Sequence, residues 1–116
     1  MERAEKFPWI LPWRAISPAG RDAYKLELRL EVTPGHPLYD VDVTPVARRC
    51  DTDDILLELH HHPAQFAVVH LTFIGAPESK SHWPSITLYS NIEHWVSRRM
   101  MPDAAYYELH GARKAA

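Results

Sequence analysis

The sequence predicts an α+β domain: an N-terminal helix, a four-stranded, mainly antiparallel meander sheet and a C-terminal helix, with both helices on one face in two layers. Over 39–74, apolar and polar residues alternate in short runs, a pattern typical of half-buried strands. Strong helix formers precede this region over 23–31, and apolar residues at helical spacing follow it from residue 92. Strands joined by short turns favour antiparallel pairing, and helices at either end favour the α+β class.

The composition fits one globular domain. The chain has 116 residues, of which 46% are apolar and 24% are charged, and its net charge is −2. This balance gives no reason to expect a nucleic-acid or membrane surface. The single cysteine, Cys50, excludes an intrachain disulfide framework and a cysteine-rich zinc site. No secretory signal or membrane-spanning stretch is visible, so we expect a cytoplasmic protein of bacterial type.

Prolines and glycines divide the chain into three parts: an apolar arm over 1–16, an α+β domain over 17–110 and a short tail over 111–116. Pro8 and Pro12 favour an extended arm. The aromatic and aliphatic side chains of the arm expose more apolar surface than would stay solvated. We therefore expect the arm to dock either on its own domain or on a partner chain.

Residues 18–32 carry conflicting signals. Leucines alternate with charged residues as in a strand, but the residue types are those of a helix. Ser17 and Pro18 form a good helix start, and the stop signal begins at Thr33, so we predict a helix. Its apolar stripe would consist of Ala19, Ala23, Leu26 and Leu30.

The expected strands cover 41–50, 54–60, 66–74 and 86–89. Pro45 lacks the amide hydrogen that a sheet ladder needs, so the first strand is expected to be an edge strand or to carry a bulge there. After the last strand, Ser90 and Glu93 have the spacing of a capping box that opens a helix. The apolar face of that helix would be formed by Ile92, Trp95, Val96 and Met100.

Several short strings resemble a group of small uncharacterised bacterial proteins. They are Gly35-His36-Pro37-Leu38-Tyr39, Asp53-Asp54-Ile55-Leu56, Val68-Val69-His70-Leu71-Thr72, Trp83-Pro84, Glu93-His94-Trp95 and Met101-Pro102-Asp103. The resemblance spans 35–103 and implies a complete single domain. It implies no activity, cofactor or catalytic residue.

Strand alternation predicts a polar sheet face opposite the helices. If the odd-numbered residues face the helices, the even-numbered ones line the other side. The polar members of that face are Asp42, Thr44, Arg48, Glu58, His60, His70 and Thr72, with Val46, Leu56 and Val68 between them. In the expected register, Thr44 faces Glu58, Asp42 faces His60, and Glu58 lies opposite Val68.

Three interpretations of this face stay open. It can be an ordinary solvated surface, a ligand or partner surface, or a metal site in which Glu58, His60 and His70 hold Zn²⁺ or Mn²⁺ with an open position for water. A carboxylate beside a histidine could also act as a general acid and base. Consecutive strand residues point to opposite faces, so at most two of the three histidines over 60–62 could share an ion.

The leading expectation is a non-enzymatic binding or interaction module, either monomeric or homodimeric, that uses the polar sheet face and the 75–85 loop with Trp83. Such a module would bind a protein or a small ligand, without nucleic acid, membrane or cofactor. One alternative is a small metal-assisted hydrolase built on the histidines and Glu58. A second is an immunity-type inhibitor, although the acidity of a nucleic-acid mimic is missing.

Overall fold

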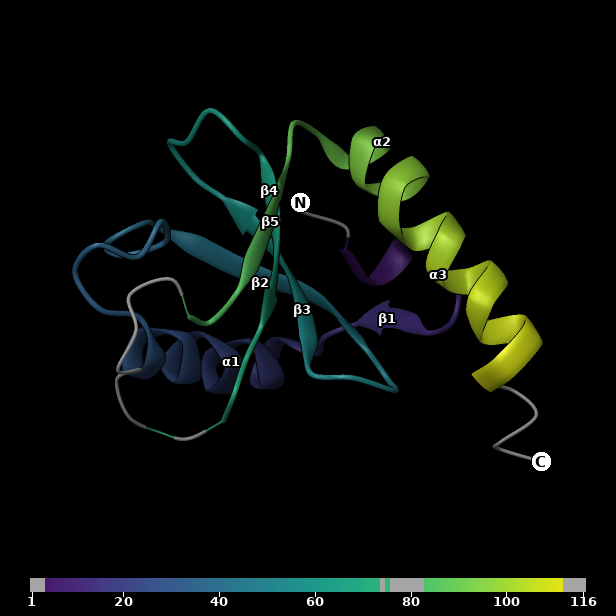
Figure 1. Ribbon diagram of the computed structural model, residues 1–116, viewed down its shortest axis with the longest axis horizontal. Helices are drawn as coiled ribbons and strands as arrows, with labels where there is room; N and C mark the ends of the chain where they lie inside the picture. The colour runs from purple at the N-terminus through teal and green to yellow at the C-terminus, as the bar shows by residue number, and fades with distance from the viewer. Residues whose placement is uncertain (1–3, 74, 76–82, 112–116) are drawn as a thin grey trace.

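The computed structural model describes residues 4–73, 75 and 83–111 and shows an α+β fold around one antiparallel sheet (Figure 1). The sheet has five strands in the order β1-β2-β3-β4-β5. They are β1 (Trp13–Ala15), β2 (Val43–Arg49), β3 (Asp54–Leu59), β4 (Phe66–His70) and β5 (Ile86–Tyr89). The α+β class and the antiparallel meander are confirmed, but the predicted number of strands is one too low.

The additional strand lies in the N-terminal arm. Trp13 pairs with Arg49 and Ala15 with Ala47, so β1 extends the sheet beyond β2. A short 3₁₀ turn, Ala4–Lys6, precedes it. Only three residues pair, too few for an alternation pattern to reveal a strand in the sequence.

The helices are α1 (Pro18–Glu31), between β1 and β2, and a C-terminal helix over 92–111. The latter is continuous in Figure 1 and comprises α2 (Ile92–Trp95), a π-helical turn (Val96–Met100), α3 (Met101–Tyr106) and a second π-helical turn (Tyr107–Gly111). No helix among the described residues is both long and apolar enough to cross a bilayer.

The helices cover opposite faces of the sheet, so the prediction of two layers with both helices on one face is wrong. Leu28 of α1 packs in a core with odd-numbered strand residues such as Leu57 and Val69. Trp95 of the C-terminal helix belongs to a second core with the even-numbered Leu56 and Val68. The physical reason is that the centre of the even-numbered face is apolar and has to be buried.

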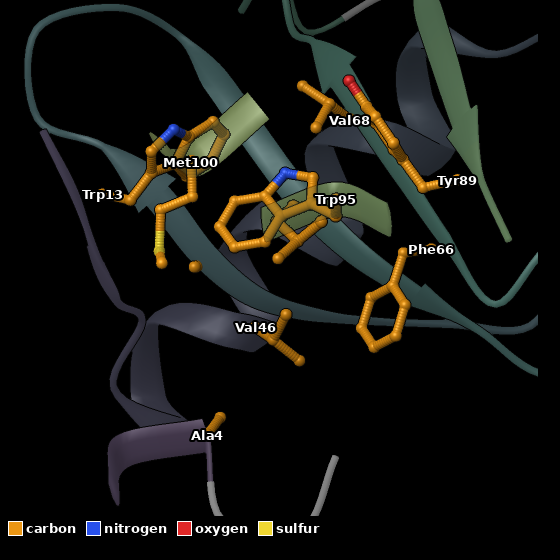
Figure 2. Packing of buried hydrophobic residues seen from close by; sticks show 10 residues of the cluster. Ala4, Trp13, Val46, Phe66, Val68, Tyr89, Trp95 and Met100 are labelled. Carbon is orange, nitrogen blue, oxygen red and sulfur yellow. The ribbon is translucent and has the colours of Figure 1, made fainter. Parts of the chain in front are cut away.

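Trp95 is the centre of this second core (Figure 2). Its fully buried ring meets the Trp13 ring edge-on, with the centroids 5.1 Å apart, and meets the Trp9 ring at 5.7 Å. Figure 2 shows the indole between Trp13 and Tyr89, above Val46. The arm therefore docks on its own domain, one of the two outcomes that its apolar composition predicts.

Helix α1 begins as predicted but presents a different side to the sheet. Ser17 caps it by accepting a hydrogen bond from the Gly20 amide at 3.2 Å. Its buried residues are Leu28 and Glu31, whereas Leu26 and Leu30 are 58% and 40% exposed. The predicted stripe thus faces outward. The inward side is difficult to recognise in the sequence because it combines one leucine with a carboxylate.

The register of the sheet agrees with the prediction on one side of β3 and differs on the other. Thr44 faces Glu58 as predicted, and a bulge follows Pro45, where the pairing shifts by one residue. Between β3 and β4, Glu58 lies opposite Phe66 instead of Val68, and Asp54 lies opposite His70. The shift is by two residues, so each side chain keeps its face.

The predicted capping box at Ser90 is also wrong by one residue. Asn91 is the N-cap, and its Oδ1 accepts a hydrogen bond from the His94 amide at 2.8 Å. Asparagine caps a helix as well as serine does, so the adjacent Ser90 and Asn91 compete for this position in any sequence-based assignment.

We expect Leu28→Ala to lower the free energy of unfolding by about 2–5 kcal/mol, because it leaves a cavity between α1 and the sheet. The matched change Leu26→Ala, on the outward side of the same helix, should cost less than about 0.5 kcal/mol. Urea unfolding at low protein concentration measures both. Equal costs for the two substitutions would contradict the orientation of α1.

Candidate functional site

The polar residues predicted for the even-numbered face separate into two groups at opposite ends of the sheet. The C-terminal helix covers the apolar centre between them, so this face does not lie opposite both helices as the sequence predicts. Asp42, Thr44, Glu58 and His60 lie at one end, while His70 lies at the other, opposite Asp54.

The first group surrounds a hollow of about 550 Å³, here called the His60 hollow. Its walls are formed by Asp42, Glu58, Leu59, His60, His61, His62 and Gln65. Thr44 Oγ1 lies 2.8 Å from His60 Nε2 and holds the imidazole from the neighbouring strand. The His60 amide donates to the Asp42 carbonyl, which extends the β2–β3 pairing to this end. The structure therefore brings together four of the residues predicted from strand alternation.

A groove of about 400 Å³ adjoins the His60 hollow and shares Asp42 with it. We call it the α1 groove. Its walls are Lys25, Leu28, Arg29, Val32, Leu38, Tyr39, Asp40, Val41, Asp42 and Val43. Lys25 Nζ lies 3.8 Å from Asp42 Oδ1, where the two cavities meet. The groove has an apolar floor and charged walls, a combination typical of small-ligand and peptide sites.

A buried histidine connects the wall of the α1 groove to the end of the 75–85 loop. His36 Nδ1 accepts a hydrogen bond from the Leu38 amide at 3.0 Å, and Nε2 lies 2.7 Å from the Pro84 carbonyl oxygen. The neutral Nε2–H tautomer satisfies both contacts. Of this loop, the structure describes residues 75 and 83–85; Trp83 is 39% exposed, and the predicted role of the remainder lies outside the described residues.

At the opposite end of the sheet, Asp54 accepts hydrogen bonds from several donors. His70 Nδ1 lies 2.8 Å from Oδ1, and Arg99 Nη2 donates to Oδ2 at 2.7 Å. Thr52 also donates its hydroxyl hydrogen to Oδ2, at 3.1 Å. His70 Nδ1 donates to Asp54, since an ionised carboxylate can only accept, and the histidine side chain is about half-exposed.

Arg99 belongs to a larger charged network beneath the C-terminal helix. Its Nε donates to Asp103 Oδ2 at 2.7 Å, and the Trp13 indole donates to the same oxygen at 2.9 Å. Arg49 Nη1 lies 3.3 Å from that oxygen and forms a two-point contact with Asp51. The guanidinium of Arg99 also lies 5.6 Å from the centre of a Trp13 ring.

The two arginines of this network stay ionised. Burial by itself would lower the pKa of Arg99, but hydrogen bonds to Asp103 and Tyr89 and the charges of Asp103 and Asp54 raise it above its ordinary value. The pKa of Arg49 is raised in the same way, chiefly by Asp51 and Asp103. Permanently charged donors saturated by carboxylates fix the helix to the sheet, so this end has a structural role.

Arg48 and Thr72 lie away from both groups. The bulge after Pro45 places Arg48 opposite Ile55, on the α1 face, so its prediction on the even-numbered face is wrong. Thr72 lies beyond the end of β4 and donates hydrogen bonds to the buried Glu31 through its amide, at 2.9 Å, and its hydroxyl, at 2.8 Å. These contacts engage both of the donors that Thr72 could offer a ligand.

Glu31 is a fully buried carboxylate with an unusual titration. The Phe73 amide donates to its second oxygen at 2.8 Å, and Phe73 adopts a left-handed conformation with φ 57°. Burial would raise the pKa of Glu31, but hydrogen bonds from Glu27, Thr72 and Phe73 outweigh it, and the pKa lies below its ordinary value. Its neighbour Glu27 has a raised pKa, because it shares a hydrogen bond with Glu31, and burial acts in the same direction.

The three predicted metal ligands do not lie together. His70 is opposite Asp54, four residues along β3 from Glu58, a separation of about 13 Å at 3.3 Å per residue. Among the residues that the structure describes, no group of three His, Cys, Asp or Glu side chains is arranged to hold a metal ion. The separation follows from the register, which places Phe66 opposite Glu58.

The sequence analysis missed the network around Arg99. A signal was present, because Arg99 and Asp103 are four residues apart on a helix, the spacing of a helical ion pair. Their contacts with Asp54 and Trp13 could not be predicted once the C-terminal helix was assigned to the other face.

Comparisons with known protein families, curated proteins and solved structures find no match to this chain.

Replacing Arg99 by methionine should lower the free energy of unfolding by about 2–3 kcal/mol, because Asp54 and Asp103 would lose their shared cation in a partly buried position. The matched substitution Arg98→Met, on the exposed side of the same helix, should cost less than about 0.5 kcal/mol. Urea unfolding of the two variants tests this. A cost for Arg99→Met no larger than that of Arg98→Met would show that the network does not hold the helix.

The lowered pKa of Glu31 predicts a specific loss of stability in acid. The carboxylate stabilises the fold at any pH above its ordinary value of about 4.5, and this stabilisation disappears as the pH falls through the lowered pKa. Glu31→Gln should lower the free energy of unfolding by about 1–3 kcal/mol near pH 7. It should also flatten the fall in stability that the wild-type protein shows below the ordinary glutamate pKa of about 4.5. Urea unfolding between neutral and acid pH measures both effects, with Glu108→Gln, an exposed change, as the control. An unchanged acid slope in Glu31→Gln would contradict the assignment.

Proposed function

We propose that this protein is a small binding module that holds a peptide segment of a partner protein across the α1 groove and the His60 hollow. The observation that carries the proposal is that the two cavities share Asp42 in their walls, so that one bound segment can contact two chemically different halves. Each half, at about 400 and 550 Å³, falls within the size range of ligand sites in proteins.

The chemistry of the two halves indicates the kind of segment that fits. The α1 groove offers the partly exposed Val32, Val41 and Tyr39 to an apolar side chain. The buried Leu28 and Leu38 lie beneath them. Asp42 and Glu58 line the His60 hollow, and their negative charge favours a cationic or hydrogen-bond-donating group there. A peptide with an apolar residue close to a lysine or arginine complements both halves.

The 75–85 loop contributes to this proposal through its described end. The hydrogen bond between His36 and Pro84 links Trp83 and Pro84 to the turn that carries Leu38 and Tyr39. A partner that contacts Trp83 would therefore bind next to Pro84, whose carbonyl oxygen is hydrogen-bonded to His36 beside the α1 groove. An immunity-type inhibitor would be one member of this binding class. The metal-assisted hydrolase has less support, because Glu58 and His60 are separated from His70.

The experiment is a selection of random displayed peptides against the full chain, followed by binding measurements and NMR shift mapping. We expect enriched peptides to combine an apolar and a basic residue and to shift the resonances of Tyr39, Asp42 and His60. Tyr39→Ala or His60→Ala should weaken binding about tenfold, as loss of one central contact does. The control His70→Ala, at the other end of the sheet, should bind normally. Peptides that map elsewhere, or binding unaffected by both site variants, would overturn the proposal.

A further inference from the structure

The outward side of α1 carries an apolar stripe that the fold leaves exposed. Ala19, Ala23, Leu26 and Leu30 all lie on the solvent side of the helix, and the two leucines are 58% and 40% exposed. Their intervals of four, three and four residues are those of alternating d and a positions in a heptad repeat. Such a stripe is the seam of a helix pair, and this helix is already held in place by its other side.

We propose that this stripe binds the same stripe of a second copy of the chain, with the two α1 helices antiparallel across a two-fold axis. In this orientation, Ala19 of one copy faces Leu30 of the other, and Ala23 faces Leu26. Every layer then joins one small and one large side chain, so the helices approach evenly along the seam. A parallel pair would join alanine to alanine at one end and leucine to leucine at the other, which leaves a gap beside a crowded layer.

The charges that border the stripe favour the same orientation. Asp22 and Arg29 are both exposed and occupy the g positions on one edge of the seam. In an antiparallel pair, g positions lie opposite each other, so Asp22 of each copy meets Arg29 of the other. In a parallel pair, a g position meets an e position, which would bring Asp22 against Glu27. The sequence therefore provides two attractive contacts in the antiparallel orientation and two repulsive contacts in the parallel one.

The seam spans about 17 Å of helix, from Ala19 to Leu30, at 1.5 Å per residue. A contact of this length supports a weak dimer that dissociates on dilution. The seam leucines Leu26 and Leu30 line neither the α1 groove nor the His60 hollow, so their variants test the dimer without altering the proposed peptide site. Arg29, at the edge of the seam, also lines the α1 groove. Either proposal can fail without the other.

Sedimentation of the full chain over a series of concentrations tests the proposal. We expect a monomer–dimer equilibrium that Leu26→Asp or Leu30→Asp abolishes. Leu109→Asp, an equally exposed leucine of the C-terminal helix, should leave the equilibrium unchanged. All of these positions are exposed, so the variants should stay folded, which thermal unfolding checks. A chain that is monomeric at every concentration, or a dimer that persists in Leu26→Asp, would overturn the proposal.

Charge exchange tests the orientation. Asp22→Arg alone and Arg29→Asp alone should each weaken the dimer about tenfold, since each replaces two attractive contacts by two repulsive ones. The double variant Asp22→Arg/Arg29→Asp should restore the original affinity. A parallel pair would behave differently, because Asp22→Arg alone would then strengthen it. Failure of the double variant to recover, or a stronger dimer with Asp22→Arg, would overturn the antiparallel arrangement.

Discussion

Burial of Trp95 against the even-numbered face of the sheet is the interaction on which the rest of the structure depends. Its ring packs edge-on against Trp13 and Trp9, so one side chain of the C-terminal helix also holds the N-terminal arm and β1 in place. An aromatic ring of this size removes a large apolar area from water and dominates the energetics of its cluster. The docking of the arm, the additional strand β1 and the third layer of the fold all follow from this contact.

The same contact determines where polar chemistry can occur on the sheet. With the centre covered, the predicted polar residues that do lie on that face stand at the two ends of the strands. At one end, Arg99 neutralises Asp54 and Asp103 and reinforces the helix that Trp95 docks. At the other end, Asp42 and His60 border open cavities. Similar residue types thus have a structural role where partly buried cations saturate them, and lie closer to solvent where they line a hollow.

The orientation of α1 depends on a second constraint, the buried carboxylate of Glu31. A buried carboxylate needs hydrogen-bond donors, and the Thr72 and Phe73 amides beyond β4 supply them. Turning the helix to bury Leu26 and Leu30 would remove Glu31 from these donors. The requirement of one charged group therefore prevails over the burial of two leucines, and the apolar stripe faces outward.

Much of this protein could be predicted from its sequence, because the signals are local. Alternation over 39–74 located β2 to β4, Ser17 and Pro18 located the start of α1, and Pro45 located the bulge. These features depend on residues near one another in the chain, such as a hydroxyl that caps its own helix or a proline that lacks an amide hydrogen. The grouping of Asp42, Thr44, Glu58 and His60 also followed, since strand alternation and a short turn fix it.

The tertiary structure alone decided which face each helix covers, which side of α1 is buried, and how the polar residues divide between the two ends of the sheet. A three-residue strand such as β1 has no periodicity of its own, and it forms because β2 offers a free edge and Trp95 buries Trp13. The contacts of Arg99 with Asp54 and of Glu31 with Thr72 join residues more than forty positions apart. Periodicity describes the faces of one element, whereas the choice between faces is a competition in free energy among all the surfaces that the chain has to bury.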